Sequence, residues 1–152
     1  MKKLLIVVLL LAAFFAALPG AAYWMGMRNM DSKPVPPEGL VFSEAQARET
    51  WVARNELPPI YMQAITPWHF YHLIWCSRND AEIEDFLSCG DEYPGLQAAA
   101  YIAKRHLVDH ALQRGLLWRY LSRTALAIWI TRHWSEDEVI AELLRIKTLP
   151  PV

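Results

Sequence analysis

The chain has 152 residues, about the length of one domain, and a formal net charge of −1. After residue 30, acidic residues outnumber basic ones. This balance argues against nucleic-acid binding, which needs a basic surface, so no nucleic-acid partner is expected. The two cysteines, Cys76 and Cys89, form no CxxC pattern and give no zinc or redox signature. In an oxidising compartment they could form a disulfide, and the alternative is two buried thiols.

Residues 1–30 differ in composition from the rest of the chain. Two lysines at the start are followed by Leu4–Met27, which contains no charged residue. A helix that crosses a bilayer needs roughly 20 apolar residues, so this segment predicts a single-pass membrane anchor. Tyr23 and Trp24 extend the apolar run and suit a membrane interface. Cleavage after Ala22 would instead make the segment a secretory signal.

Both interpretations keep the two lysines inside the cell and export the rest of the chain. We therefore expect a protein of the cytoplasmic (inner) membrane, with the lipid bilayer as a partner and the C-terminal domain in the periplasm. The alternative is a domain secreted after signal cleavage.

Residues 31–42 contain three prolines and a glycine, and predict an extended linker. Residues 43–152 are expected to form an all-α domain. A serine followed three residues later by Gln or Glu is a helix-start pattern, and it occurs at Ser43 and at Ser135. The sequence therefore predicts that one helix begins after each of these serines.

Apolar residues recur every three or four positions from 96 to 111 and from 117 to 128, on either side of Gly115. This period predicts two longer helices joined at the glycine. Asn79 followed by Glu82 predicts a further helix start. No segment shows the alternation that is typical of a strand, which favours the all-α class.

The run QAITPWHFYH, residues 63–72, gathers five ring side chains after a double proline. His69, Phe70 and Tyr71 are candidate ligand-binding residues if the run lines a pocket. The alternative is aromatic packing in the core, as in many small domains.

His106 and His110 lie four residues apart and would share one helix face, a spacing that can hold a metal ion. A catalytic zinc site needs a third ligand, and the Glu of an HExxH pattern is absent because Leu107 follows His106. We therefore expect no metal and no cofactor, with a metal-binding helical protein as the alternative.

Three stretches together resemble glycosyltransferase family 51, the peptidoglycan glycosyltransferases. TALAIWITRHWSEDEVIAELL, residues 124–144, resembles the family's ALxLExRxSKDEILELYL. GLQAAAYIAKRHLV, residues 95–108, is similar to GSTITQQLAKNLFL, and the aromatic run is similar to the family's AxEDRRFYEH. The resemblance covers about Leu57 to Leu144. It implies a small helical, lysozyme-like lobe that acts in cell-wall synthesis on a lipid-linked peptidoglycan precursor, beside other cell-wall synthesis proteins.

The chain departs from this family at the residues that carry the chemistry. Thr66 stands where the family has its catalytic Glu, and a threonine cannot act as a carboxylate base. No acid follows Lys104 at the spacing of the second catalytic Glu. The resemblance therefore implies a non-catalytic binding or scaffold module. Its candidate ligand-binding residues are Lys104, which matches the family's lysine, and Arg119, which falls near the family's arginine.

Two other interpretations stay open. An active glycosyltransferase would need displaced acids such as Glu84, Asp85 or Asp109. A helical membrane protein of different ancestry would use its aromatic face to bind a partner protein.

Overall fold

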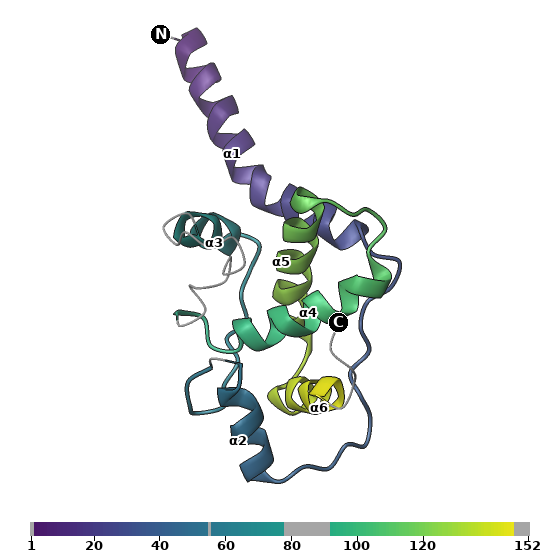
Figure 1. The fold of residues 1–152 in the computed structure, drawn as a ribbon. Coiled ribbons are helices and arrows are strands. Elements are labelled where there is room, and N and C mark those ends of the chain that lie inside the picture. The colour runs from purple at the N-terminus through teal and green to yellow at the C-terminus, as the bar shows by residue number, and fades with distance from the viewer. Residues whose placement is uncertain (1, 55, 78–91, 148–152) are drawn as a thin grey trace.

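The computed structural model describes residues 2–54, 56–77 and 92–147 (Figure 1). Within these ranges the chain is all-helical, as predicted, and its only β-type pairing is an isolated bridge between Met30 and Ala111. The predicted helix start at Asn79 and Glu82 lies outside the described residues. The helices are α1 (Lys2–Arg28), α2 (Glu44–Val52), α3 (His69–Ser77), α4 (Leu96–His110), α5 (Leu116–His133) and α6 (Glu136–Lys147).

Helix α1 is long and apolar enough, over Lys3–Arg28, to cross a membrane, although a signal sequence would pass the same test. Its N-terminal part extends away from the other helices, and its C-terminal part lies against α5 (Figure 1). The two parts differ in how far their side chains are exposed. Leu4 and Phe14 are largely exposed, whereas Pro19 and Gly26 are buried.

Helix α5 is the centre of the fold, because α1 and α4 both pack against it. Its apolar face buries Leu126 and Ile130, and Leu143 of α6 and Trp51 of α2 are buried in the same core. Burying one such side chain contributes about 1.5–3 kcal/mol. Small residues let the helices approach closely: a Cβ at Gly26 would lie 2.4 Å from the carbonyl oxygen of Leu121.

Both predicted serine caps are confirmed. Ser43 Oγ accepts the Gln46 N–H at 3.2 Å, and Gln46 Oε1 accepts the Ser43 N–H at 2.9 Å. Ser135 is paired with Glu138 in the same reciprocal way. Each box satisfies N–H groups that a helix start leaves without an intrahelical acceptor.

Helix α4 begins differently, at Gly95, whose φ of 83° is in the left-handed region and which has no side chain to cap the helix. The buried carboxylate of Glu56 takes over that role. It accepts N–H groups from Gly95 at 2.8 Å, Gln97 at 2.8 Å and Ala98 at 3.2 Å. A negative charge at a helix N-terminus also complements the helix dipole. Glu56 therefore fixes the position of α4 against the loop that precedes α3.

The segment after α1 runs along α4. The Asp31 N–H donates to the His110 carbonyl at 3.1 Å, and His106 Nε2 lies 2.9 Å from the Ser32 carbonyl oxygen. The Lys33 ammonium lies 5.1 Å from the centre of the Trp129 ring. We call Asp31–Lys33 the strap, because it holds the end of α1 against α4 and α5.

Candidate functional site

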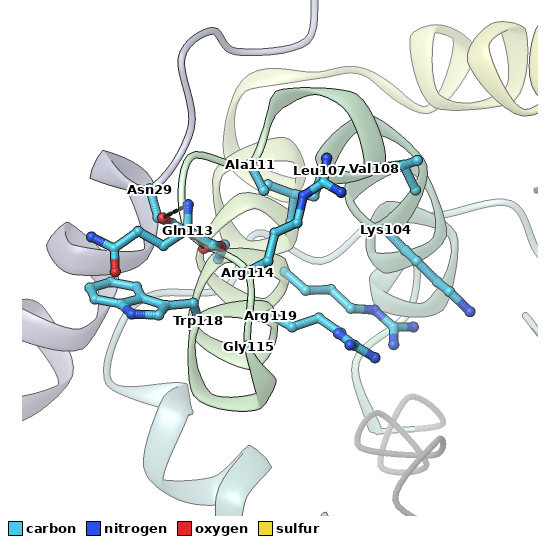
Figure 2. A pocket seen from close by; sticks show the side chains of 12 residues that line it. Asn29, Lys104, Leu107, Val108, Ala111, Gln113, Arg114, Gly115, Trp118 and Arg119 are labelled. Atoms are coloured by element: carbon cyan, nitrogen blue, oxygen red, sulfur yellow. Dashed lines mark hydrogen bonds between the residues drawn. The ribbon is translucent and has the colours of Figure 1, made fainter.

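A cavity of about 330 Å³ lies where the end of α1, the second half of α4 and the first half of α5 meet. Its walls combine cationic, amide and apolar side chains. Figure 2 shows the side chains that line it, which are Asn29, Lys104, Leu107, Val108, Ala111, Gln113, Arg114, Gly115, Trp118, Arg119, Ser122 and Arg123. We call this cavity the basic pocket.

Four cationic side chains, Lys104, Arg114, Arg119 and Arg123, line the basic pocket, and none of the lining residues in the described part of the chain is acidic. Among the residues that the structure describes, no carboxylate pairs with Lys104, Arg114 or Arg119. Lys104 and Arg119 extend to the same side of the pocket, away from Asn29 and Trp118 (Figure 2). The pocket therefore has a net positive field that favours an anionic ligand.

One wall of the pocket is fixed by Asn29, which is buried just after the end of α1. Its amide nitrogen donates to the Ser122 hydroxyl at 2.9 Å and to the Gln113 carbonyl at 3.1 Å. Its amide oxygen accepts the Gln113 N–H at 2.8 Å. These bonds tie the membrane-type helix to the connection between α4 and α5, so the pocket lies directly at the end of α1.

The apolar side chains of the pocket come from both helices that form it. Leu107 and Val108 belong to α4, and Trp118 belongs to the first turns of α5. Cations beside an indole and aliphatic groups suit a ligand with both charged and apolar parts. Among the residues that the structure describes, the lining contains no carboxylate that could act as a base, and its cations, amides and apolar groups can bind and orient a ligand.

The structure thus brings together two of the five candidate ligand-binding residues, Lys104 and Arg119. The sequence analysis missed Arg114, Trp118 and Arg123 as lining residues. The spacing of Arg119 and Arg123, four positions apart on a predicted helix, places them on one face and could have identified the second arginine. Arg114 comes from the loop before α5, where helical spacing gives no information.

The other three candidates, His69, Phe70 and Tyr71, lie on α3 and do not line the basic pocket. Phe70 is a core residue with 3% of its surface exposed. His69 Nδ1 accepts the Thr66 N–H at 3.0 Å, so the residue at the expected base position helps to begin α3. The Tyr71 hydroxyl donates to the carbonyl oxygen of Phe15 in α1.

His72 belongs to a second group of polar rings beside α3. Its Nδ1 lies 3.0 Å from the Tyr93 hydroxyl, and its Nε2 lies 3.5 Å from the Glu92 carboxylate. Partial burial and then the Glu92 charge raise the pKa of Tyr93 above its ordinary value. Within the described part of the chain, the Glu92 carboxylate lies in contact with this group.

His106 and His110 do share one face of α4, as predicted, and their rings stack at 4.2 Å. The strap occupies their polar atoms: Asp31 Oδ1 lies 2.8 Å from His110 Nδ1, and the Ser32 carbonyl oxygen is near His106. No group of three metal-binding side chains occurs among the described residues. The bonds to His110 lower the pKa of Asp31, and burial lowers the pKa of His106.

Only some of the remaining candidates lie within the described residues. Asp109 is exposed on α4 and does not line the basic pocket. Glu84, Asp85 and Cys89 lie outside the described residues, and so does the side chain of Cys76. The predicted disulfide and two of the three displaced acids therefore stay predictions.

Comparisons of the chain with protein families, with characterised proteins and with solved structures gave no match.

Proposed function

We propose that this protein is a membrane-anchored, non-catalytic module that binds an amphipathic phosphorylated ligand in the basic pocket. The observation that carries the proposal is the set of three cations, Lys104, Arg114 and Arg119, that line one pocket without an acidic partner in the described chain. Arginine binds a phosphate through two parallel N–H bonds, and lysine adds a compact positive charge.

The ligand class follows from the pocket's position as well as from its charge. Asn29 lies one residue beyond a helix that is long and apolar enough to span a bilayer, and it forms a pocket wall. A lipid-linked pyrophosphate could therefore keep its chain in the bilayer and place its phosphates among the cations. The side chain of Trp118 and the aliphatic groups would contact the sugar or the first part of the lipid.

The resemblance to the peptidoglycan glycosyltransferases supports one member of this ligand class. Lys104 matches a lysine of that family's motif, Arg119 falls near the arginine of another, and both line the basic pocket. We therefore propose a lysozyme-like lobe that binds the lipid-linked peptidoglycan precursor, as a scaffold for cell-wall synthesis. The absence of an acid among the described lining residues supports a binding role over polymerisation.

The anchored form in the inner membrane, with the helical domain in the periplasm, is part of the proposal. The lysines at the N-terminus favour a cytoplasmic start. Ala22 and Tyr23, on either side of the candidate cleavage point, both pack against the core. Cleavage there would remove Pro19, which is also buried, so the fold supports an uncleaved helix.

The test is equilibrium binding of a lipid-linked disaccharide pyrophosphate to the full chain in nanodiscs. The variant with Lys104→Gln and Arg119→Gln should bind about a hundredfold more weakly, if each charged contact contributes about 1.5 kcal/mol. Arg48→Gln with Arg132→Gln is the matched control, because it removes the same charge from exposed positions outside the pocket. Equal affinities of the two double variants would contradict the proposal.

A polymerisation assay distinguishes the non-catalytic role from the alternative of an active glycosyltransferase. We expect no glycan product from the lipid-linked disaccharide. If product forms, the non-catalytic role is wrong, and changing Glu84, Asp85 and Asp109 to alanine would show whether displaced acids carry the activity.

A further inference from the structure

The part of α1 that no other helix contacts is too short to cross a bilayer. If α1 spans the membrane, some of the helical domain must therefore lie within it. The stretch Leu4–Phe14 is about 16 Å long at roughly 1.5 Å per residue, whereas a bilayer's hydrocarbon core is about 30 Å thick. A span that starts at Leu4 therefore reaches to about Tyr23. Yet α3 already contacts α1 at Phe15, and Pro19 is buried.

The contact at Phe15 has a specific cause. Pro19 lies inside α1 and has no N–H group, so the Phe15 carbonyl, four residues earlier, loses its helical donor. The Tyr71 hydroxyl of α3 donates to that same carbonyl oxygen. An unpaired carbonyl is costly in hydrocarbon, and partners from neighbouring helices are the usual remedy for a proline in a membrane helix. This bond fastens α3 to the membrane helix.

The surfaces near this contact are apolar and exposed. On α3 and just before it, Trp68 is 59% exposed and Tyr71 is 42% exposed. At the start of α5, Leu116 is 59% exposed and Leu117 is 65% exposed. Figure 1 shows α3 near the middle of α1 and the start of α5 beside the C-terminal part of α1, whereas α2 and α6 lie at the far end of the molecule. Exposed aromatic and leucine side chains beside a membrane span are typical of the bilayer interface.

We propose that α3 is embedded in the outer leaflet of the bilayer, where it is fastened to α1, and that the first turn of α5 lies in the outer interface. The occupant of this apolar surface is lipid, because the surface is continuous with the span itself. The proposal rests on the membrane-spanning role of α1 given above, and it is independent of the ligand in the basic pocket.

This position would make α1 a part of the domain's packing instead of a flexible tether. The domain would then keep one orientation to the membrane, with α2 and α6 farthest from it. Arg28, whose guanidinium lies 4.5 Å from the Trp24 ring centre, would mark the level of the lipid headgroups. The basic pocket begins at Asn29, so its cations would lie at the same level.

The test is paramagnetic broadening of NMR signals from the full chain in bicelles. One sample contains a phospholipid with a nitroxide near its headgroup, and the other contains a water-soluble gadolinium chelate. We expect the lipid probe to broaden the Trp68 indole and Leu117 methyl signals several-fold more than those of Leu57 and Val41. Leu57 and Val41 are the controls, because they are 69% and 95% exposed and lie outside the proposed interface. The gadolinium chelate should give the opposite order.

Leu9 in α1 separates the ways in which the proposal can fail. If the lipid probe broadens Leu9 but treats Trp68 and Leu117 like Leu57, the interfacial position is wrong while the anchor stands. If Leu9 is not broadened by lipid, α1 does not span the bilayer, and the interfacial position falls together with the anchor. Ligand binding by the basic pocket is measured separately, so it is unaffected by either result.

Discussion

The two parts of α1 have similar apolar compositions but different surroundings. From Leu4 to Phe14 the large apolar side chains are exposed, whereas from Phe15 onward the helix meets α3 and α5. The difference is made by small residues and by one proline. Gly26 admits the backbone of α5, and Pro19 leaves a carbonyl for Tyr71. Hydropathy alone therefore identifies a span but does not show which part of it belongs to a folded domain.

The largest expected effect comes from a larger side chain at Gly26, where α1 and α5 are in close contact. Gly26→Leu would place a Cβ 2.4 Å from the Leu121 carbonyl oxygen and 2.7 Å from the Ala125 Cβ, with a larger side chain beyond. Since both neighbours lie on α5, the helices must separate. We expect a loss of about 3 kcal/mol in the free energy of unfolding, measured by thermal unfolding in detergent micelles.

Gly20→Leu is the matched control on the same helix. No atom outside the local helix backbone lies within 4 Å of a Cβ at Gly20. Replacing glycine by leucine within a helix gains up to about 0.8 kcal/mol of helix propensity, so this variant should be as stable as the parent chain or slightly more stable. Equal destabilisation by both substitutions would show that the close contact of Gly26 with α5 does not determine the effect.

A smaller effect is expected from the bond that joins α3 to α1. Tyr71→Phe removes the donor to the Phe15 carbonyl and should cost about 1–2 kcal/mol. With Pro19→Ala, residue 19 regains an N–H group and can bond to that carbonyl within the helix. Tyr71→Phe should therefore cost much less in the Pro19→Ala background.

A double-mutant cycle measures this coupling directly. If the two substitutions act independently, the free energies of unfolding will add, and the bond does not compensate for the proline. A coupling of about 1 kcal/mol would support the pairing of these two features.

The fold was predictable to the extent that local patterns decide it. The caps at Ser43 and Ser135 and the break at Gly115 depend on residues three or four positions apart, and all three are present. The cap of α4 was not predictable, because Glu56 reaches Gly95 from a distant loop. Long-range pairs of this kind depend on how the helices pack.

The candidate site residues also differ in whether a local pattern could reveal their role. Lys104 and Arg119 were identified through a resemblance of motifs, and both line the basic pocket. Tyr71 was identified with them, but its partner is a carbonyl that a proline fifty-two residues earlier leaves free. Nothing in the aromatic run itself indicates that partner, so sequence reasoning gave the residue a ligand-binding interpretation.

The smallest expected effect concerns the strap, which follows the end of α1 and contacts α4. Burial lowers the pKa of His106 below its usual 6.5, so just below pH 6.5 the unfolded chain binds more protons at this residue than the folded chain. Stability from this residue is present above pH 6.5 and falls as the pH drops through that value toward the lowered pKa. The lowered pKa of Asp31 acts in the same direction only at still lower pH, since its ordinary value is 3.8.

Hydrogen exchange of the Asp31 amide, which donates to the His110 carbonyl, measures this effect. After correction for the intrinsic exchange rate, its protection should decrease between pH 7.5 and pH 5, while amides of α5 near Gly26 change little. His106→Gln keeps a donor near the Ser32 carbonyl but does not titrate. In this variant the protection of the Asp31 amide should therefore depend less on pH. If the parent chain and this variant respond alike to acid, His106 does not control the pH response of the strap.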